Sequence, residues 1–307
     1  MKKFDDGMIQ GSPRAVLSEI AKTIPQHCKE YVIVIGSLAV GYRFFAEDES
    51  ISVRTKDADC LISPRIQAVS AGLAITEKLF EAHWQFRSDE QWPRPGDEKT
   101  PVEKLPAVRL NPPGQTEWFI ELLTVPKSPK DRKLRWIRLK TSFGHFGLCS
   151  FGFLSLTNYE PYPTELGIYI ARPEMMALAN MLEHPEINPE TMSGLIAGRP
   201  IKRSNKDLGR VLAIARLSEQ KKEDAMLGWP GIWRKALRKR FPSDWRGLAR
   251  RTGSGLRKIL ASEPDLDEAR HSCVYGLLSS RPPTLEELRL SGERLLKDAV
   301  EPIEKNP

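Results

Sequence analysis

The sequence predicts an α/β (α+β) N-terminal domain, residues 1–170, followed by a mainly helical and basic C-terminal domain, residues 171–307. Short apolar, β-branched runs alternate with helical periodicity in the first half, whereas helical periodicity dominates after residue 170. The length of 307 residues suits two domains of about 150 residues each. Hydrophobic residues make up 40% and charged residues 28% of the chain, which excludes wholesale disorder.

The first half is predicted to alternate between helices and strands. Apolar spacing and turn residues predict helices over Pro13–Thr23, Leu38–Phe45 and Arg65–Phe86, strands over Tyr31–Ile35, Asp59–Ile62, Ala107–Leu110 and Glu117–Thr124, and a hairpin or strand pair within Phe143–Leu156. The intervening stretch Gln91–Lys104 has the composition of a loop, and Pro126–Arg138 is basic and marked by prolines.

The second half is predicted to begin near Pro173, because proline is favoured in a first helical turn. The clearest helices are expected at Glu174–Leu182, Lys206–Ser218, Ile232–Arg240, Asp244–Arg251 and Leu285–Val300, and the tail Glu301–Pro307 is expected to be frayed.

Composition excludes several classes of protein. No apolar run approaches the roughly 20 residues of a membrane-spanning helix, and the first ten residues lack the apolar segment of a secretory signal. The four cysteines and five histidines are scattered, without the spacing of a zinc site or a disulfide framework. We therefore expect a cytoplasmic protein with no membrane partner.

Positive charge is unevenly distributed. Residues 199–258 hold 18 Lys and Arg against 5 Asp and Glu, a net charge of +13, whereas the whole chain carries +7, so the remainder carries −6. Trp229, Trp233 and Trp245 are interleaved with the basic residues, a pattern that suits phosphate pairing and base stacking. The alternative is a solvated helical surface whose tryptophans anchor it to the core.

Paired acids follow the first predicted strand. Nineteen residues separate Ser37 from Asp57, and Asp59 follows two positions later. Alternate side chains of a strand project from the same face, so the two carboxylates lie side by side. Two neighbouring carboxylates repel each other unless a cation lies between them, and Mg²⁺ binds through one or two carboxylates plus substrate phosphates. Glu121, an acid within an apolar strand, is the expected third member, with Glu117 as a second candidate; the alternative for Glu121 is a solvent-facing residue at a sheet edge.

Gly36 and Ser37 suit a phosphate site at the end of the same strand. A glycine allows close approach of the backbone, and the serine hydroxyl and the first amides of the next helix can donate to phosphate oxygens. In the second half, Lys202, Arg203, Lys206 and Asp207 open a predicted helix. Cations oppose the dipole there, which suggests a bound anion, although a solvated first turn and an Asp207 cap are the plain alternatives.

Together these motifs resemble the nucleotidyltransferase superfamily with the polymerase-β-type fold. The segments Arg54–Asp59 and Phe119–Leu123, with the Lys206-Asp207 pair, resemble the branch of AbiEii-type toxins from toxin–antitoxin systems, over roughly residues 30–220. Three positions depart from the family pattern: Glu121 replaces a frequent Asp, Asn180 stands where a lysine is expected, and Arg210 stands where a second acid often follows.

The resemblance implies an Mg²⁺-dependent enzyme that moves a nucleoside monophosphate from an NTP to tRNA or another RNA, as a toxin paired with an antitoxin protein. It implies a cleft between the domains, with one or two Mg²⁺ ions on Asp57, Asp59 and Glu121 and a catalytic role for Asp207. Gly36 and Ser37 would bind the β- and γ-phosphates. The pyrophosphate leaving group would be neutralised by the cations of Lys202, Arg203 and Lys206.

Two alternatives remain open at this stage. The acceptor could be a small molecule or a protein, which would need a small polar pocket rather than the basic segment 199–258. The chain could also be an inactive binding module of the same fold, for which Asn180 and Arg210 are the supporting residues.

Overall fold

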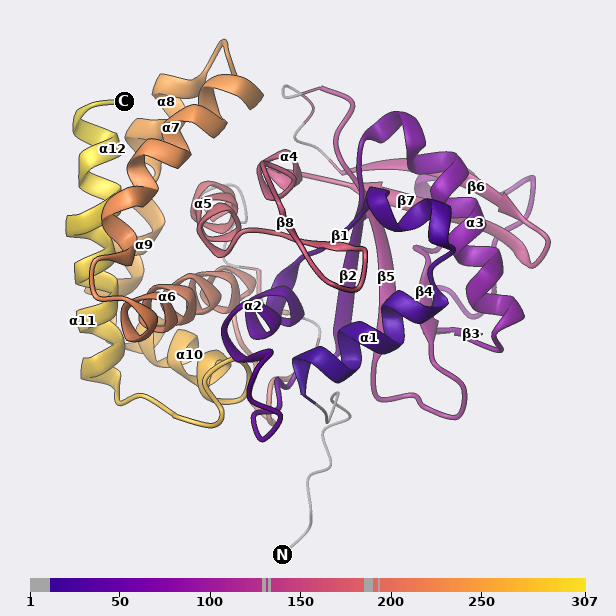
Figure 1. The fold of residues 1–307 in the computed structure, drawn as a ribbon, viewed down its shortest axis with the longest axis horizontal. Coiled ribbons are helices and arrows are strands. Elements are labelled where there is room, and N and C mark those ends of the chain that lie inside the picture. The colour runs from indigo at the N-terminus through magenta and orange to yellow at the C-terminus, as the bar shows by residue number, and fades with distance from the viewer. Residues whose placement is uncertain (1–11, 129–130, 132–133, 185–189, 193) are drawn as a thin grey trace, which may run out of the picture. The chain divides into compact units, whose positions relative to one another are not determined.

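The computed structural model describes residues 12–128, 131, 134–184, 190–192 and 194–307, and the chain divides into two units, Met1–Ala171 and Arg172–Pro307. The first unit is a mixed sheet with helices and the second is helical, as Figure 1 shows. No helix in the described part of the chain is long and apolar enough to span a bilayer.

The helices of the first unit are α1 (Pro13–Thr23), α2 (Gly36–Phe45), α3 (Ala68–Glu81) and the short α4 (Leu154–Thr157). Its strands are β1 (Val32–Val34), β2 (Asp57–Ile62), β3 (Gln85–Phe86), β4 (Arg109–Asn111), β5 (Phe119–Thr124), β6 (Arg135–Thr141), β7 (Gly144–Ser150), β8 (Tyr162–Pro163) and β9 (Tyr169–Ile170). The helix predicted at Pro13–Thr23 is confirmed with the same bounds. Ser12 caps it by accepting a hydrogen bond from the Ala15 amide at 3.3 Å, and Pro13 occupies the first turn.

The sheet runs in the order β3-β4-β5-β2-β1-β9-β8, and β7 joins it beside β5 and carries β6. Strands β2 and β5 are parallel, whereas β1 and β4 pair antiparallel with β2 and β5, respectively. The predicted strands at Tyr31–Ile35, Asp59–Ile62, Ala107–Leu110 and Glu117–Thr124 are confirmed as β1, β2, β4 and β5, with shifts of up to two residues at their ends. Strand β2 therefore lies at the centre of the sheet, with β1 on one side and β5 on the other.

Two predictions for the first unit are wrong in their extent. The helix expected over Arg65–Phe86 is a 3₁₀ turn followed by α3, and the chain then reverses at His83, whose φ is +64°, and enters β3. Trp84 is drawn into the core, where its ring meets that of Trp118 edge-on at 5.5 Å.

The hairpin expected within Phe143–Leu156 takes its first strand from residues 135–141 instead, and α4 follows its second strand. Strand β6 is amphipathic: Leu139 is buried, whereas most of the other β6 side chains are partly or fully exposed. The charged residues of β6 therefore match an edge strand, which the basic, proline-marked composition of Pro126–Arg138 had not predicted.

The second unit contains α5 (Pro173–Glu183), α6 (Arg203–Lys221), α7 (Trp229–Arg240), α8 (Trp245–Arg251), α9 (Ser254–Ala261), α10 (Glu263–Val274), α11 (Leu285–Leu295), a π-helical turn (Leu296–Val300) and α12 (Glu301–Lys305). Helices α5, α10 and α11 pack against the central α6 (Figure 1). The five predicted helices are present, and α9 and α10 are additional.

The tail is helical, not frayed. Ile303 of α12 is fully buried, and Glu304 forms an ion pair with Arg257 and accepts a hydrogen bond from the Gly253 amide at 2.9 Å. Burial of one apolar side chain and pairing of a neighbouring carboxylate favour the helix over an unfolded end.

Candidate active site

The paired acids of β2 lie on one face of the sheet. Asp57 and Asp59 are half-buried, whereas the alternating Ala58 and Cys60 are fully buried on the opposite face. Burial strongly raises the pKa of the Cys60 thiol, so this side chain stays neutral in the core. The alternation predicted from sequence is therefore confirmed, and it leaves both carboxylates on the face that solvent and ligands can reach.

Strand β5 adds the third acid beside them. The parallel register places Asp59 opposite Glu121, so the Glu121 side chain projects from the same face as the two aspartates. Glu117 precedes β5 and is exposed, and its carboxylate accepts a hydrogen bond from the Thr116 amide at 2.9 Å. Of the two acids considered for the third position, Glu121 alone lies within the strand that flanks β2.

Gly36 lies directly under the Asp59 carboxylate. It has a φ of +75°, and a Cβ atom placed on it would lie 3.0 Å from Asp59 Oδ2. The backbone amide of Ile35 donates to the Asp59 carbonyl at 2.9 Å, which fixes the turn between β1 and α2. The N-terminus of α2 has no side-chain cap, so its first amides are not bonded to a side chain of the cap residue. Because α2 begins at Gly36, the positive end of the helix lies beside the Asp59 carboxylate, and the half-buried Ser37 is the next residue.

Asp57 is oriented by a local hydrogen bond. The Thr55 hydroxyl, on a side chain that is 7% exposed, lies 3.0 Å from Asp57 Oδ1. A carboxylate that is held by a buried hydroxyl is restricted in rotation, while its second oxygen remains available to another ligand.

Arg109 forms an ion pair with Glu121. Its Nε donates to Glu121 Oε2 at 3.0 Å and its Nη2 to Oε1 at 3.3 Å, a bidentate pair between neighbouring residues of β4 and β5. Burial by itself lowers the pKa of the Arg109 guanidinium, but the carboxylates of Glu121, Asp89 and Asp59 outweigh it, and the net shift is upward. This arginine is therefore firmly cationic within the acid cluster.

A second arginine lies close by. Arg87 places its guanidinium 4.5 Å from the centre of the Phe119 ring, and Arg109 lies 5.8 Å from the same ring. Burial and then repulsion from Arg109 lower the pKa of Arg87, while the carboxylates of Asp89 and Asp57 oppose that shift. Both arginines belong to the electrostatic surroundings of the acids.

Sequence reasoning missed both arginines. Arg109 stands within the apolar strand segment Ala107–Leu110, where a charged side chain needs a partner, and this was the available signal. The pairing of β4 with β5 was not evident from sequence, so Glu121 and Arg109 could not be matched in advance.

The other predicted residues open α6 in the second unit. Lys202 forms an ion pair with Asp265 at 2.7 Å, and its backbone amide donates to Glu268 at 3.0 Å. The buried Asn205 bridges both carboxylates at 2.9 Å. Lys202 is thus part of a network between α6 and α10, whereas Arg203 is exposed, Lys206 is half-buried, and neither side chain has a carboxylate partner among the described residues.

Asp207 lies one turn before Arg210 on α6. The closest contact of the two side chains is 3.7 Å, and both are largely buried. The arginine that departs from the family pattern is therefore the ion-pair partner of the predicted catalytic acid.

The basic segment divides into two parts. Its first part is largely neutralised within the second unit: Arg199 pairs with Asp267 at 2.6 Å, Arg216 with Glu287 at 3.1 Å, and Lys222 with Asp224 at 3.1 Å. In its second part, residues 229–258 hold ten Lys and Arg against the single acid Asp244, a net charge of +9. The unbalanced charge is thus concentrated on α7, α8 and α9.

The tryptophans of this segment belong to the core. Trp229, Trp233 and Trp245 are 5%, 0% and 8% exposed, and the Trp233 indole donates to the Glu174 carbonyl at 2.8 Å. Base stacking needs an accessible ring face, so the expectation of stacking tryptophans is wrong and the anchoring alternative is correct.

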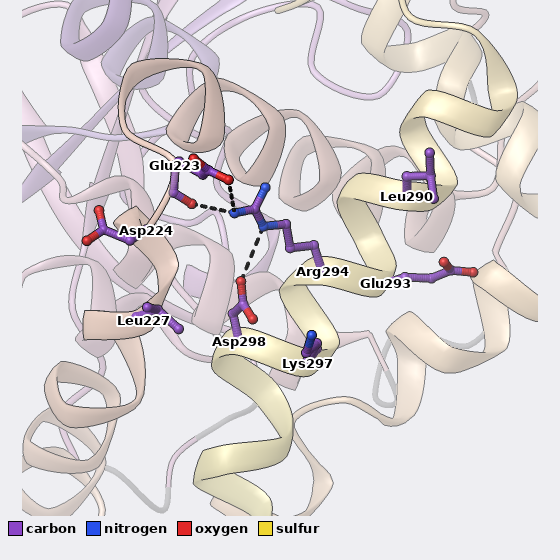
Figure 2. A pocket seen from close by; sticks show the side chains of 8 residues that line it. All are labelled: Glu223, Asp224, Leu227, Leu290, Glu293, Arg294, Lys297 and Asp298. Carbon is purple, nitrogen blue, oxygen red and sulfur yellow. Dashed lines mark hydrogen bonds and ion pairs between the residues drawn. The ribbon is translucent and has the colours of Figure 1, made fainter.

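A surface depression of about 830 Å³ lies elsewhere in the second unit, between the turn after α6 and the end of α11. Figure 2 shows Arg294 among acids, with bonds to Glu223 and Asp298; a further contact reaches Glu219 at 3.3 Å. None of the site residues predicted from sequence lines this depression.

No three Asp, Glu, His or Cys side chains in the described part of the chain are close enough together to hold a metal ion jointly. Comparison with known proteins finds no matching family model, no matching curated protein and no matching solved structure.

Proposed function

We propose that this protein is an Mg²⁺-dependent nucleotidyltransferase that moves a nucleoside monophosphate from an NTP to an RNA acceptor, tRNA among the candidates. The observation that carries the proposal is the register of β2 and β5, which puts Asp57, Asp59 and Glu121 on one face beside the start of α2. By its resemblance to AbiEii-type toxins, we further propose that it acts as a toxin that an antitoxin protein restrains.

Two carboxylates of this cluster fit a magnesium site. Gly36 leaves room for the Asp59 carboxylate where a Cβ would press on it, and Thr55 orients the carboxylate of Asp57. Magnesium binds proteins through one or two carboxylates and takes its remaining ligands from water and substrate phosphates. When bound, the ion supplies charge neutralisation and Lewis-acid polarisation at the phosphates.

The remaining residues bind and orient the substrates. The uncapped amides of α2 and the Ser37 hydroxyl donate to phosphate oxygens of the NTP. In the transfer, the acceptor hydroxyl oxygen forms a bond to the α-phosphorus as the bond to the α–β bridging oxygen breaks. Pyrophosphate leaves, and the hydroxyl proton passes to a carboxylate of the cluster.

Four exposed cations of α7 and α8 favour an RNA acceptor. They are Lys235, Arg238, Arg246 and Arg250, which we term the basic face. Arg238 and Arg246 lie 4.2 and 4.5 Å from the centre of the Trp245 ring, so an aromatic ring and not a carboxylate holds them. Lys235 and Arg250 lie one helical turn away on the same sides of α7 and α8. No member has a carboxylate partner among the described residues, which leaves their N–H groups available to a polyphosphate backbone.

The test is to incubate the full-length protein with each α-labelled NTP, Mg²⁺ and total cellular RNA, and to follow the label. Transfer to RNA is expected for the wild type and for Glu117→Gln, an exposed carboxylate outside the cluster. It should be abolished in Asp57→Asn and Asp59→Asn, with melting temperatures in metal-free buffer within about 3 °C of wild type. Full activity of the Asp57→Asn, Asp59→Asn double variant refutes the proposal, and label on a protein or small molecule refutes the RNA acceptor.

A further inference from the structure

Charged residues form a row across one face of the sheet. Asp59 of β2 pairs with Glu121 of β5, which in turn pairs with Arg109 of β4. The row continues into Arg87, which follows β3 directly and donates its backbone amide to the Arg109 carbonyl at 2.9 Å. Residues paired across neighbouring strands project from the same face, so two acids and then two arginines follow one another across β2, β5, β4 and β3.

The guanidinium of Arg87 is held by groups other than carboxylates. Its Nη1 donates to the Thr116 carbonyl at 3.1 Å, and its Cζ lies 4.5 Å from the centre of the Phe119 ring. Phe119 lies two residues before Glu121 on β5 and therefore on the same face. Among the residues that the structure describes, Arg87 has no carboxylate at ion-pair distance, so its Nε and Nη2 are available to donate to a ligand.

The surroundings of Arg87 disfavour its positive charge. Burial, and then repulsion from Arg109, lower the pKa of Arg87. The carboxylates of Asp89 and Asp57 oppose that shift without cancelling it. A phosphate bound at Arg87 would supply the missing negative charge, and the planar fork of a guanidinium matches two phosphate oxygens at once.

The place of Arg87 in the row favours a phosphate of the acceptor over one of the NTP. Gly36, at the start of α2, lies beside Asp59 on the side of β1, where the proposed function places phosphates of the NTP. In the transfer, the attacking and leaving oxygens lie on opposite sides of the phosphorus. With the leaving phosphates at α2 and the reacting phosphorus at the acids, the acceptor hydroxyl approaches from the side of β4 and β3, where Arg87 lies.

We infer that Arg87 binds the phosphate next to the reacting hydroxyl of the RNA acceptor. This inference rests on the proposed function and deepens it, because it assigns one group of the acceptor to a residue of the first unit. A phosphate held at this point restricts the neighbouring hydroxyl to positions near the acids. It also favours an RNA strand over an acceptor that lacks a phosphate beside its hydroxyl.

The first experiment changes the acceptor and leaves the protein intact. A short RNA carries a neutral methylphosphonate either next to the hydroxyl that receives the label or at a distant linkage, and each form is compared with the unmodified RNA. Replacement next to the hydroxyl is expected to lower kcat/KM for the acceptor by about tenfold, the lower end of what a hydrogen bond to a charged group contributes. The distant replacement should leave kcat/KM unchanged. Equal effects at both positions overturn the inference without any variant.

Arg87→Gln should abolish the difference between the unmodified RNA and the RNA modified next to the hydroxyl. It should leave the dissociation constant of the NTP, measured without acceptor, at the wild-type value. Arg43→Gln is the matched control, because Arg43 of the same unit also lies over an aromatic ring, that of Tyr162 at 5.1 Å, and this variant should keep the difference. The inference fails if Arg87→Gln still discriminates as the wild type does, or if it weakens NTP binding instead.

Asp57→Asn separates this inference from the proposed function. If the wild type places no label on unmodified RNA, or if Asp57→Asn keeps full transfer, the proposed function is wrong and the role of Arg87 falls with it. If transfer requires Asp57 but is indifferent to the methylphosphonate next to the hydroxyl, only the role of Arg87 is wrong.

Discussion

Gly36→Ala tests the contact between the turn after β1 and the Asp59 carboxylate. Gly36 has a φ of +75°, and residues with a Cβ lose roughly 1–2 kcal/mol in the left-handed region. The added Cβ would lie 3.0 Å from Asp59 Oδ2, which is closer than ordinary van der Waals contact, so the carboxylate must shift by a few tenths of an ångström. The expected effect is therefore a loss of stability combined with a displaced ligand.

Gly114→Ala is the matched control in the same unit. Gly114 has a φ of +69° within a turn in which the Gln115 amide donates to the Pro112 carbonyl at 3.1 Å, and a Cβ there would meet nothing within 4 Å. Both alanine variants should lose about 1–2 kcal/mol in the free energy of unfolding, measured by urea denaturation.

Only Gly36→Ala should also weaken Mn²⁺ binding, by about tenfold, because metal sites are sensitive to groups that orient their ligands. The reasoning is refuted if Gly36→Ala binds Mn²⁺ as tightly as the wild type. It is refuted equally if Gly114→Ala shows the same loss of affinity, since backbone strain without a contact to Asp59 would then explain both results.

Two further predictions concern the second unit. If Arg238 and Arg246 each neutralise a phosphate, the charge reversals Arg238→Glu and Arg246→Glu together should make the log–log salt dependence of tRNA binding shallower by about 1.4, at roughly 0.7 per contact with a single strand. Lys222→Glu, which reverses an exposed lysine already paired with Asp224, should leave that slope unchanged; equal slopes in all three proteins contradict the prediction. Burial, and then repulsion from Lys258, lower the pKa of His184, so the unfolded chain binds a proton more readily than the folded one. The contribution of neutral His184 to the free energy of unfolding is therefore complete above pH 6.5 and is lost as the pH decreases through the pKa of the folded state. Denaturation curves of His184→Gln should lose this pH dependence. An unchanged pH dependence in the variant would exclude His184 as its cause.

Local patterns in the sequence predicted much of the fold. The capped helix at Pro13–Thr23 and the strands around β1, β2, β4 and β5 follow from turn residues and apolar periodicity within a few residues. The common face of Asp57 and Asp59 follows from the two-residue repeat of a strand, which needs no knowledge of its neighbours. Where a local pattern was ambiguous, as after α3 and around β6, the burial of Trp84 and the pairing of β6 with β7 decided the outcome.

The partners of these residues came only from the tertiary structure. Glu121 meets Arg109 because β4 lies beside β5, and Lys202 meets Asp265 because α10 packs on α6. The same long-range packing buries Trp233 and neutralises Arg199, so it separates the cations that hold the second unit together from those left exposed on the basic face. The charge and type of each residue can be read from the sequence. Its partner, however, often belongs to a segment far away in sequence, and only the packing of strands and helices in the folded protein brings the two together.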